Sequence, residues 1–375
     1  MKKISIGLFF LCFFLLFSLG CGEEKERTMI NLAPSSQTTQ SPSPTIQEPK
    51  ASTESSLLPP SEDMFKSPLT NEWVSKEVAE LRPLAVMIPN DASALPHYNI
   101  SKADILYEVP VEGKITRLMG IFNDWTALER VGNIRSCRDY FVYWAFEWDA
   151  IYVHAGGPFY INDVISRSDT QNIDALSAPE GVFYRTTDRS APQNLYFDGD
   201  DLSREIGRLN YPLQTRMGYT EGAHFQFAPN NNAMDQYPNA ADALQIDLSN
   251  AYPVTGTKFI YHKEDGLYYR YQTPSGGAHM DAATGTQLAF TNILIQFTYA
   301  EVRDNQGYLA FQCIDSRRDG WYFSKGKGIH VNWVKTSDYG PTRYYDDNGR
   351  EILLNEGKTM ICIVQDGSTF AFLNK

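Results

Sequence analysis

The sequence is poor in cysteine and in basic residues, and each shortage excludes a class of protein. Five cysteines in 375 residues are too few for a disulfide scaffold and too widely spaced for a zinc ribbon. The 33 basic residues are outnumbered by 45 acidic ones, and the net charge of -12 argues against a surface that wraps nucleic acid. The sequence also lacks a phosphate-binding P-loop, a His-Glu-x-x-His motif and a Gly-x-Ser-x-Gly elbow. No cofactor is therefore expected.

Long apolar runs are confined to the N-terminus. A basic start precedes an uncharged apolar run over 4–17, and Ser18-Leu19-Gly20-Cys21 follows. This pattern is typical of a secretory signal segment that ends in the lipobox of a bacterial lipoprotein, although Ser18 stands where leucine is usual. We expect residues 1–20 to be removed and Cys21 to carry acyl chains such as palmitate, which anchor the protein to the extracytoplasmic face of the cell membrane. An ordinary secreted protein with an incidental cysteine is the alternative.

Residues 22–63 contain no aromatic side chain and are rich in Ser, Thr, Pro, Gln and Glu. Such a composition cannot bury enough apolar surface to offset the entropy of ordering, so 21–63 is predicted to be a disordered tether. Fully extended, this tether would reach on the order of 140 Å and would let the folded part stand well off the membrane.

Three cysteines remain after Cys21, namely Cys137, Cys313 and Cys362. An odd number cannot all pair, so buried free thiols are the simpler expectation. The sequence leaves open whether Cys313 and Cys362 form a disulfide.

The residue pattern changes at about Asn71. Apolar runs bounded by turn residues predict strands, and apolar spacings of three and four predict helices at 138–148, 160–167 and 201–209. The expected strands lie at 84–88, 104–109, 115–122, 150–154, 259–261, 267–271, 293–297, 321–323, 329–334 and 360–364. The helices end before a loop at 228–232, which favours an N-terminal domain of mixed α/β layers over 64–230 and a β-rich domain over 231–375. The expected fold class is α+β, with the two domains packed together.

Several motifs occur in a specific order along the chain, and their ranges are 82–88, 103–108, 112–119, 132–141, 149–157, 277–285, 292–295 and 326–333. Together they resemble the YerB-like lipoproteins of Gram-positive bacteria. The resemblance covers most of 82–370 and implies an N-terminal α+β domain, a C-terminal β-rich domain and a place in the cell envelope. The function of that family is unknown, so no reaction is implied. Pro89, Lys114, Cys137 and Gln193 stand where the family usually has Asp, Gly, Ala and His.

Arginines at strand ends and in turns are the most suggestive group in this acidic sequence. The candidate ligand-binding residues are Arg117, Arg135, Arg138, His154, Arg185, Arg189 and Asn194. A guanidinium fork suits carboxylate or phosphate oxygens, so the arginines are predicted to bind an anionic ligand such as a cell-wall fragment. The alternative is that they pair with nearby Asp and Glu to hold loops. Arg135 and Arg138 are expected near the N-terminus of the following helix, where the dipole also favours negative charge.

Two arrangements are candidates for catalysis. His154 closes an apolar strand before the glycine turn Gly156-Gly157, and it could act as an acid or base or could hydrogen-bond locally to shape the turn. Glu108 and Glu112 could form the carboxylate pair that glycoside cleavage requires, although a strand end separates them. His279 and Asp281 could supply two metal ligands, but a third is missing, so no metal site is expected.

These features favour a membrane-tethered extracytoplasmic lipoprotein that binds an anionic envelope ligand or an envelope protein partner without chemistry of its own. The alternatives are a cell-wall hydrolase or lyase that uses His154 or the Glu108 and Glu112 pair, and a purely structural lipoprotein. The classes would be distinguished by whether one open cleft is shared by Arg117, Arg135, Arg138 and His154.

Overall fold

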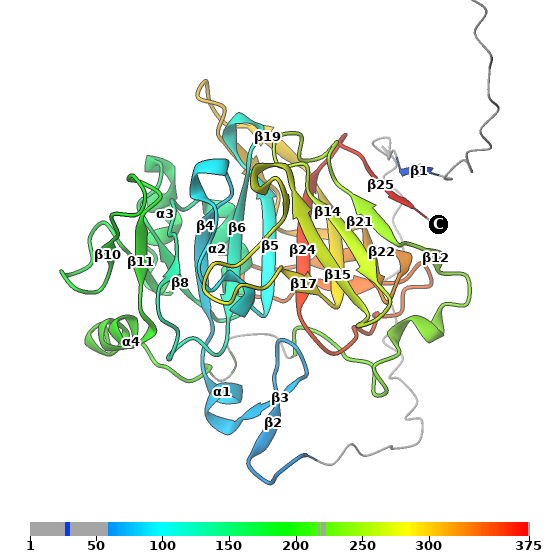
Figure 1. The fold of residues 1–375 in the computed structure, drawn as a ribbon, viewed down its shortest axis with the longest axis horizontal. Helices are drawn as coiled ribbons and strands as arrows, with labels where there is room; N and C mark the ends of the chain where they lie inside the picture. Colours follow the sequence, from blue (N-terminus) through cyan, green and yellow to red (C-terminus); the bar gives the residue numbers. More distant parts are fainter. Residues whose placement is uncertain (1–26, 31–58, 217, 219–222, 374–375) are drawn as a thin grey trace, which may run out of the picture.

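The computed structural model describes residues 27–30, 59–216, 218 and 223–373, so Cys21 and the expected signal segment lie outside the described residues. One sheet of eleven strands runs through both halves of the molecule (Figure 1). Its strands are β4 (Leu84–Pro89), β5 (Ile105–Pro110), β6 (Thr116–Phe122), β8 (Ile151–His154), β9 (Asn172–Asp174), β12 (Ala241–Asp242), β18 (Asn292–Thr298), β21 (Asp315–Ser324), β22 (Lys327–Lys335), β23 (Arg343–Tyr345) and β24 (Thr359–Gln365). Their order is β12-β22-β21-β18-β24-β5-β6-β4-β8-β9, and β23 pairs with β22.

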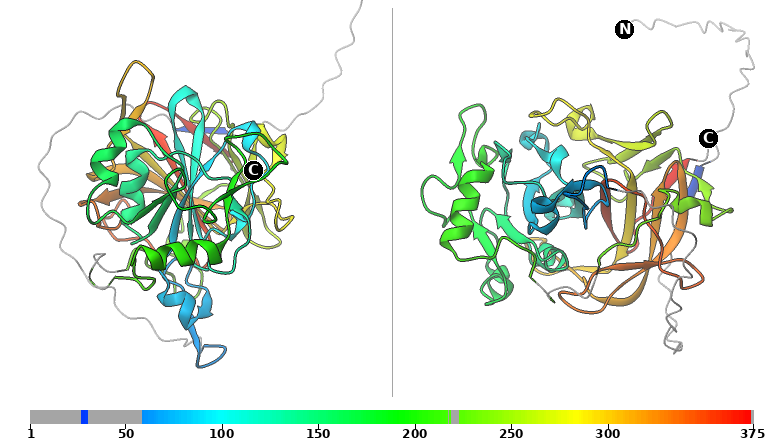
Figure 2. Two further views of the ribbon diagram at one scale, coloured as in Figure 1. Left: turned by 90° about the vertical axis from the view of Figure 1, so that its left-hand side faces the viewer. Right: turned by 90° about the horizontal axis from the view of Figure 1, so that it is seen from below.

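The two halves predicted from the sequence meet inside this sheet. β24, from the end of the chain, runs parallel to β5 with Thr359 opposite Ile105 and Cys362 opposite Glu108. On its other side β24 pairs with β18, also in parallel. The halves lie along the long axis of the molecule (Figure 2), and backbone hydrogen bonds of one continuous sheet join them.

A second sheet of seven strands covers one face of the second half. Its order is β1-β25-β13-β14-β15-β16, with β17 paired to β15. The bounds are β1 (Arg27–Ile30), β13 (Gln245–Asp247), β14 (Lys258–His262), β15 (Leu267–Gln272), β16 (Gly277–Ala278), β17 (Ala289–Phe290) and β25 (Phe370–Leu373). Phe259 and Tyr268 of this sheet share a buried core with Ile293 and Ile295 of β18. The two sheets therefore pack face to face as a sandwich, with aromatic and β-branched residues of facing strands between them.

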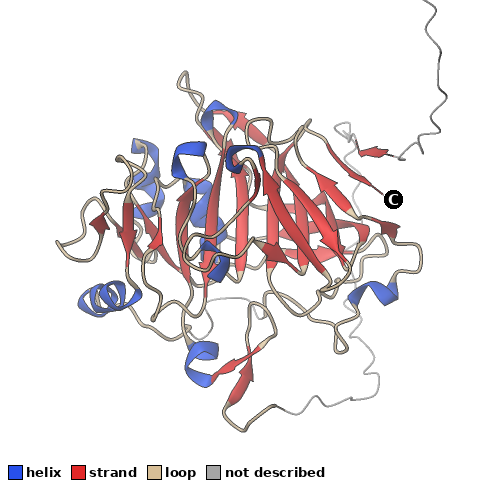
Figure 3. Ribbon diagram, viewed as in Figure 1, coloured by secondary structure: helices blue, strands red, loops and turns tan. Residues whose placement is uncertain are grey.

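The remaining elements surround these two sheets. Among the described residues the α-helices all lie in the first half, and the short 3-10 turns, which Figure 3 also draws as helices, occur in both halves. The smaller sheets are β10 (Tyr184–Arg185), β11 (Leu195–Phe197) and β7 (Val131–Gly132); β2 (Met64–Lys66) and β3 (Trp73–Ser75); and β19 (Ala300–Val302) and β20 (Leu309–Phe311). The helices are α1 (Lys76–Glu80), α2 (Asp139–Phe146), α3 (Asn162–Ile165) and α4 (Gly199–Arg208). Short 3-10 turns are η1 (Ala92–Ala94), η2 (Ile100–Lys102), η3 (Glu112–Lys114), η4 (Phe159–Ile161), η5 (Ala233–Gln236) and η6 (Thr273–Ser275). The described residues contain no helix with the length and hydropathy needed to cross a membrane.

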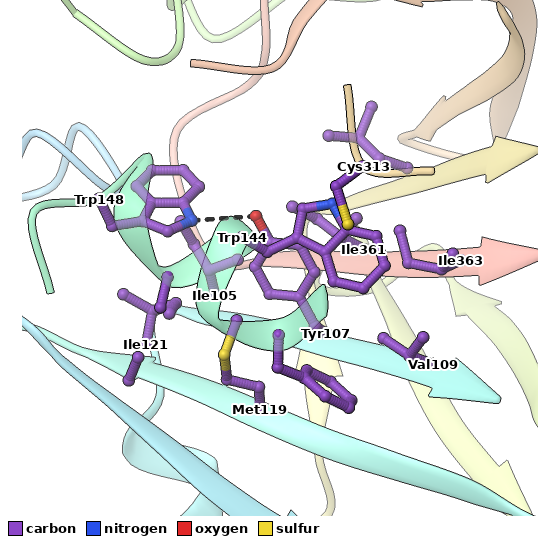
Figure 4. Packing of buried hydrophobic residues seen from close by; sticks show 14 of the residues in the cluster. Ile105, Tyr107, Val109, Met119, Ile121, Trp144, Trp148, Cys313, Ile361 and Ile363 are labelled. Atoms are coloured by element: carbon purple, nitrogen blue, oxygen red, sulfur yellow. Dashed lines mark hydrogen bonds between the residues drawn. The ribbon is translucent and has the colours of Figure 1, made fainter. Parts of the chain in front are cut away.

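Helix α2 covers the face of the large sheet opposite the second sheet. Trp144 and Trp148, at and just beyond the end of α2, pack with Tyr107 of β5 and Ile361 of β24 in one buried cluster (Figure 4). The Trp148 indole N–H donates to the Tyr107 hydroxyl at 2.9 Å, so the buried polar tips of both rings are paired. Replacing Trp144 with alanine is a change of the kind that costs about 3–5 kcal/mol. This packing fixes α2 against the strands beside it.

The three cysteines that follow Cys21 lie in these buried cores. Cys137, Cys313 and Cys362 are all buried and all free. Burial raises the pKa of the Cys137 thiol to about 12, so this group behaves as a small apolar residue. Cys313 and Cys362 do not form a disulfide.

Candidate functional site

The ends of three neighbouring strands of the large sheet, β4, β6 and β8, lie next to one another. β4 pairs with β6 and with β8, so Arg117 at the start of β6 lies opposite the last residue of β4. The segment 133–137 passes between the same strand ends: the Arg135 amide donates to the Met87 carbonyl at 2.8 Å, and the Ala155 amide donates to the Arg135 carbonyl at 3.0 Å. Three stretches that are distant in sequence are thereby brought together.

Arg138 is the member of this group with a carboxylate partner. It stands at the N-cap of α2, as the sequence predicted, and is 3% exposed. Its Nε donates to Glu112 Oε2 at 3.1 Å, its Nη2 donates to the other oxygen of Glu112, and its Nη1 donates to the Cys137 carbonyl at 2.6 Å. Burial opposes ionisation of Glu112, yet the hydrogen bond and charge of Arg138 hold the pKa of Glu112 below its ordinary value. This bidentate pair is structural.

Arg117 is buried without a carboxylate of its own. The side chain is 5% exposed, Nη1 donates to the Ser136 carbonyl at 2.8 Å, and Nε is buried with no hydrogen-bond partner. Burial and the neighbouring charge of Arg138 lower the pKa of Arg117 to about 10. The guanidinium remains protonated at neutral pH, so its charge is poorly compensated.

Arg135 completes a cluster of three guanidinium groups, which we call the arginine cluster (Arg117, Arg135 and Arg138). Arg135 is half-buried, its Nε is buried without a partner, and its side chain makes no hydrogen bond or ion pair within the described chain. Glu112 therefore balances only one of the three charges. An unsatisfied buried donor costs about 1–3 kcal/mol, so the Nε atoms of Arg117 and Arg135 favour an acceptor that comes from outside the chain.

Tyrosines line the outer side of the cluster. The Arg138 guanidinium lies over the Tyr308 ring at 5.0 Å, and the Arg303 guanidinium lies over the Tyr160 ring at 4.0 Å. The Tyr160 hydroxyl is buried without a hydrogen-bond partner and adds another unsatisfied polar group. The sequence analysis missed these rings, because they follow no motif and come from both halves of the chain.

A cleft of about 360 Å³ opens beside the arginine cluster, where the two halves meet. Its walls include the β5–β6 turn at 110–116, the loop at 250–253 and residues Val302, Gly307 and Leu309. Glu112 lines this cleft and also pairs with Arg138, so the cleft and the cluster are neighbours. Glu112 is the residue that the cleft and the cluster share, and the three arginines themselves do not line the cleft.

His154 borders the same strand ends and makes local contacts. It is 1% exposed; Nδ1 faces the Gly156 carbonyl at 3.0 Å, and Nε2 faces Asn172 Oδ1 at 3.2 Å. Gly156 has a φ of 62°, which the turn requires and glycine adopts without strain. Both ring nitrogens face protein oxygens, so the geometry favours the local role of His154 in shaping the turn over the acid or base role.

The predicted pair of Glu108 and Glu112 does not form. Glu108 lies on the face of β5 opposite Tyr107 and is fully buried, with Oε2 bonded to Arg270 Nη2 at 2.8 Å and Oε1 accepting from Thr257 at 2.8 Å. Glu112 lies beyond the strand end and pairs with Arg138. Each carboxylate forms an ion pair with a different arginine. The two are therefore not placed to act together on one glycosidic bond.

The other candidate ligand residues support loops. Arg185 Nη1 donates to Asn194 Oδ1 at 2.8 Å, and Asn194 Nδ2 donates to the Thr186 carbonyl at 2.7 Å, which ties β10 to β11. Arg189 Nη1 donates to the Ala94 carbonyl at 2.7 Å. No contact in the described chain joins these side chains to the arginine cluster, so the structure places them apart from it.

His279 and Asp281 hold the halves together. Asp281 Oδ1 accepts from the Asn99 amide at 3.0 Å, and Asp281 Oδ2 accepts from the Ser101 amide at 2.8 Å. His279 Nε2 lies 3.0 Å from Nδ1 of His97, a residue that the sequence analysis did not single out. Among the described residues, no three His, Cys, Asp or Glu side chains form a metal-binding group.

Family comparisons agree with this architecture. Two models of a protein family of unknown function, DUF3048, match the chain: the N-terminal domain over residues 69–212 and the C-terminal domain over residues 245–361. Together they span more than half of the chain, so this protein belongs to that two-domain family.

One relative is YerB of Bacillus subtilis (strain 168), whose name marks it as a candidate lipoprotein. It is 28% identical over 310 residues, which are 82% of this chain and 89% of YerB. The crystal structure of Bacillus subtilis YerB matches this fold with a TM-score of 0.70 at 27% identity, over 82% of this chain and 99% of that one. The expected α+β fold and the resemblance to YerB-like proteins are confirmed.

Proposed function

We propose that this protein is a lipoprotein on the extracytoplasmic face of the cell membrane and that its arginine cluster binds an anionic envelope ligand. The observation that carries the ligand proposal is the excess of two guanidinium charges over the single carboxylate of Glu112. In a protein with a net charge of -12, such an excess is a local exception. The signal segment and the kinship with YerB support the anchored location.

The ligand class follows from the donors. Guanidinium N–H groups in a fixed fork match the oxygens of a phosphate or a carboxylate, and the Tyr160 hydroxyl adds a donor that can rotate. A cell-wall fragment or the acidic segment of an envelope protein presents such oxygens. We expect such a ligand to approach through the cleft that Glu112 lines.

Arg135→Ala tests the binding role, with pyrophosphate and citrate as probes in titration calorimetry. We expect affinity for at least one probe to fall tenfold or more, which is about 1.4 kcal/mol. The free energy of unfolding should change by no more than about 0.5 kcal/mol, because Arg135 has no protein partner to lose. Arg135→Lys should restore binding poorly, because a point charge lacks the bidentate fork.

Arg204→Ala is the matched control. Arg204 is exposed on α4 and pairs with Asp201, so its loss should leave probe binding unchanged. A strongly destabilised Arg135→Ala protein that still binds both probes would contradict the ligand proposal, and so would a wild-type protein that binds neither.

The anchoring proposal has a separate test. We expect Cys21→Ser to release the protein from the membrane fraction, because a chain without acyl groups has no lipid anchor. Mass spectrometry of the mature wild-type protein should show an acylated N-terminal residue 21. Residues before Cys21 in the mature protein, or full membrane retention of the variant, would refute the anchor.

The alternative of a cell-wall hydrolase or lyase gains no support from these positions. Glu108 and His154 are buried with their polar atoms bonded, and Glu112 is held by Arg138. A general acid or base must reach the proton that it transfers.

A further inference from the structure

A second hollow lies beside β22, at the edge of the large sheet. In the strand order this edge is separated by several strands from β6, which carries Arg117 of the arginine cluster. The hollow has a volume of about 410 Å³ and runs between the loop at 236–241, the middle of β22 and the turn at 346–350. β22 and β12 form the outer edge of the sheet there, whereas β4, β6 and β8 carry the arginine cluster (Figure 1). We call this hollow the edge groove.

The edge groove coincides with a gap in strand pairing. β12 pairs with β22 only at Lys327 and Gly328, and β23 pairs with it only at Asn332–Val334. Among the described strands, none pairs with 329–331 on this side. Edge backbone that no strand covers offers hydrogen-bonding groups to a ligand.

Two aromatic side chains line the groove, Trp321 and Tyr237. Trp321 stands opposite His330 in the β21–β22 pairing, with ring centroids 5.8 Å apart, and its indole N–H is buried without a hydrogen-bond partner. Tyr237 is half-buried, and burial raises its pKa to about 12, so its hydroxyl stays protonated. Each ring combines an apolar body with a polar tip.

The charged groups of the groove are already paired. His330 Nδ1 lies 2.7 Å from Asp347 Oδ1 and His330 Nε2 lies 3.4 Å from Asp319 Oδ1, while Arg350 Nη2 donates to Asp346 Oδ2 at 2.8 Å. The positive groups are therefore neutralised, which disfavours a phosphate or carboxylate ligand. The amides of Gln236, Asn239 and Asn348 and the carboxylates offer both donors and acceptors.

We propose that the edge groove binds an uncharged oligosaccharide. A sugar ring presents apolar C–H faces, which suit aromatic rings, and hydroxyl groups that donate and accept, which suit amides, paired carboxylates and open edge backbone. The groove has the volume of a small-molecule site. This proposal is independent of the arginine cluster.

Titration calorimetry on the mature protein, with triacetylchitotriose and maltotriose as probes, tests the proposal. We expect saturable binding of at least one probe and a loss of at least fivefold in affinity for Tyr237→Ala. Trp321 also packs against Phe323, Phe370 and Phe372, so Trp321→Phe is the second variant, because it keeps the packing and removes the indole. The Trp321→Phe protein should also bind the sugar at least fivefold more weakly than the wild type.

Two controls separate this site from other surfaces. Tyr299→Ala removes an exposed aromatic ring outside the groove, and Arg135→Ala disables the arginine cluster, so both should bind the sugar as the wild type does. Absence of binding to both sugars would overturn the proposal. Equal affinity in wild type, Tyr237→Ala and Trp321→Phe would also overturn it, and so would tighter binding of trigalacturonic acid, an acidic sugar of similar size.

Discussion

A line of buried polar side chains joins the two halves. The Pro89 carbonyl can only accept, so His97 Nε2, at 2.7 Å, must carry a proton, and His97 Nδ1 accepts from His279 Nε2 at 3.0 Å. At the other end a guanidinium can only donate, so His279 Nδ1 accepts from Arg270, which also pairs with Glu108 at 2.8 Å. Both histidines are therefore neutral, and each tautomer is fixed by its neighbours.

We expect the free energy of unfolding to fall as the pH drops from about 6.5 to about 4.5. Burial lowers the pKa of His97 to about 4, and burial with the charge of Arg270 holds the pKa of His279 well below its ordinary value. The folded pKa lies below the unfolded one, so this stability is present above pH 6.5 and is lost toward pH 4, by about 3 kcal/mol for His97. Urea unfolding at a series of pH values measures the loss.

Asp104→Asn provides the matched comparison. Burial raises the pKa of Asp104 to about 6, so this carboxyl contributes stability at low pH that is lost as the pH rises through 6, the opposite sense to the histidines. Without that offset, the variant should lose more stability than wild type between about pH 6.5 and 4.5. Equal losses, or no loss in either protein, would contradict the assignment.

The sequence singled out five arginines as one candidate group, and the structure brings together Arg117, Arg135 and Arg138 while Arg185 and Arg189 contact other loops. Arg117, Arg135 and Arg138 follow strand ends and a turn, and strand ends of one sheet meet at its edges. Partner choice depends on the side of the strand from which a residue projects and on loops far away in sequence. Glu108 therefore pairs with Arg270, across 162 positions, which no local pattern indicates.

Among the secondary-structure elements, β1 departs most from expectation. Residues 21–63 were predicted to be a tether, but Arg27–Ile30 pair antiparallel with β25, from Arg27 opposite Leu373 to Ile30 opposite Phe370. Composition averaged over the whole segment hides a four-residue strand, and the pairing partner lies at the other end of the chain. The tether prediction was wrong for these four residues.

Deletion of 22–34 should therefore destabilise the folded part, whereas deletion of 35–55 should not. Loss of β1 leaves the β25 edge unpaired, and losing about 1–2 kcal/mol would lower the thermal midpoint by at least about 2 °C. Thermal unfolding followed by circular dichroism compares the two deletions. Equal midpoints would mean that β1 contributes nothing to stability.

The strands and helices of the central region were predictable from local pattern. The expected helix at 201–209 is α4, where Leu202 and Ile206 are buried behind acidic residues in the first turn. Strand pairing was not predictable in the same way, because alternation identifies a strand without naming its neighbour. The parallel contact of β24 with β5 is the clearest case.

For the whole molecule, the shared sheet predicts one cooperative unit. β24 fills the place between β18 and β5, so fragment 59–230 lacks a neighbour for a fully buried strand, and fragment 231–375 exposes β24. We expect each fragment alone to show no cooperative thermal transition, and the full chain to unfold in a single step by fluorescence and by circular dichroism. A sharp transition in either fragment would contradict this expectation.

The position of β24 also governs when folding can finish. A strand that begins at residue 359 of 375 lies in the middle of the large sheet, and β25, still later, pairs with β1 near the beginning. Such long-range contacts make folding slow and prevent the sheet from closing until almost the entire chain has been synthesised. A ribosome-bound chain of this protein therefore stays unfolded until synthesis is almost complete. An unfolded polypeptide can pass lengthwise through a narrow pore.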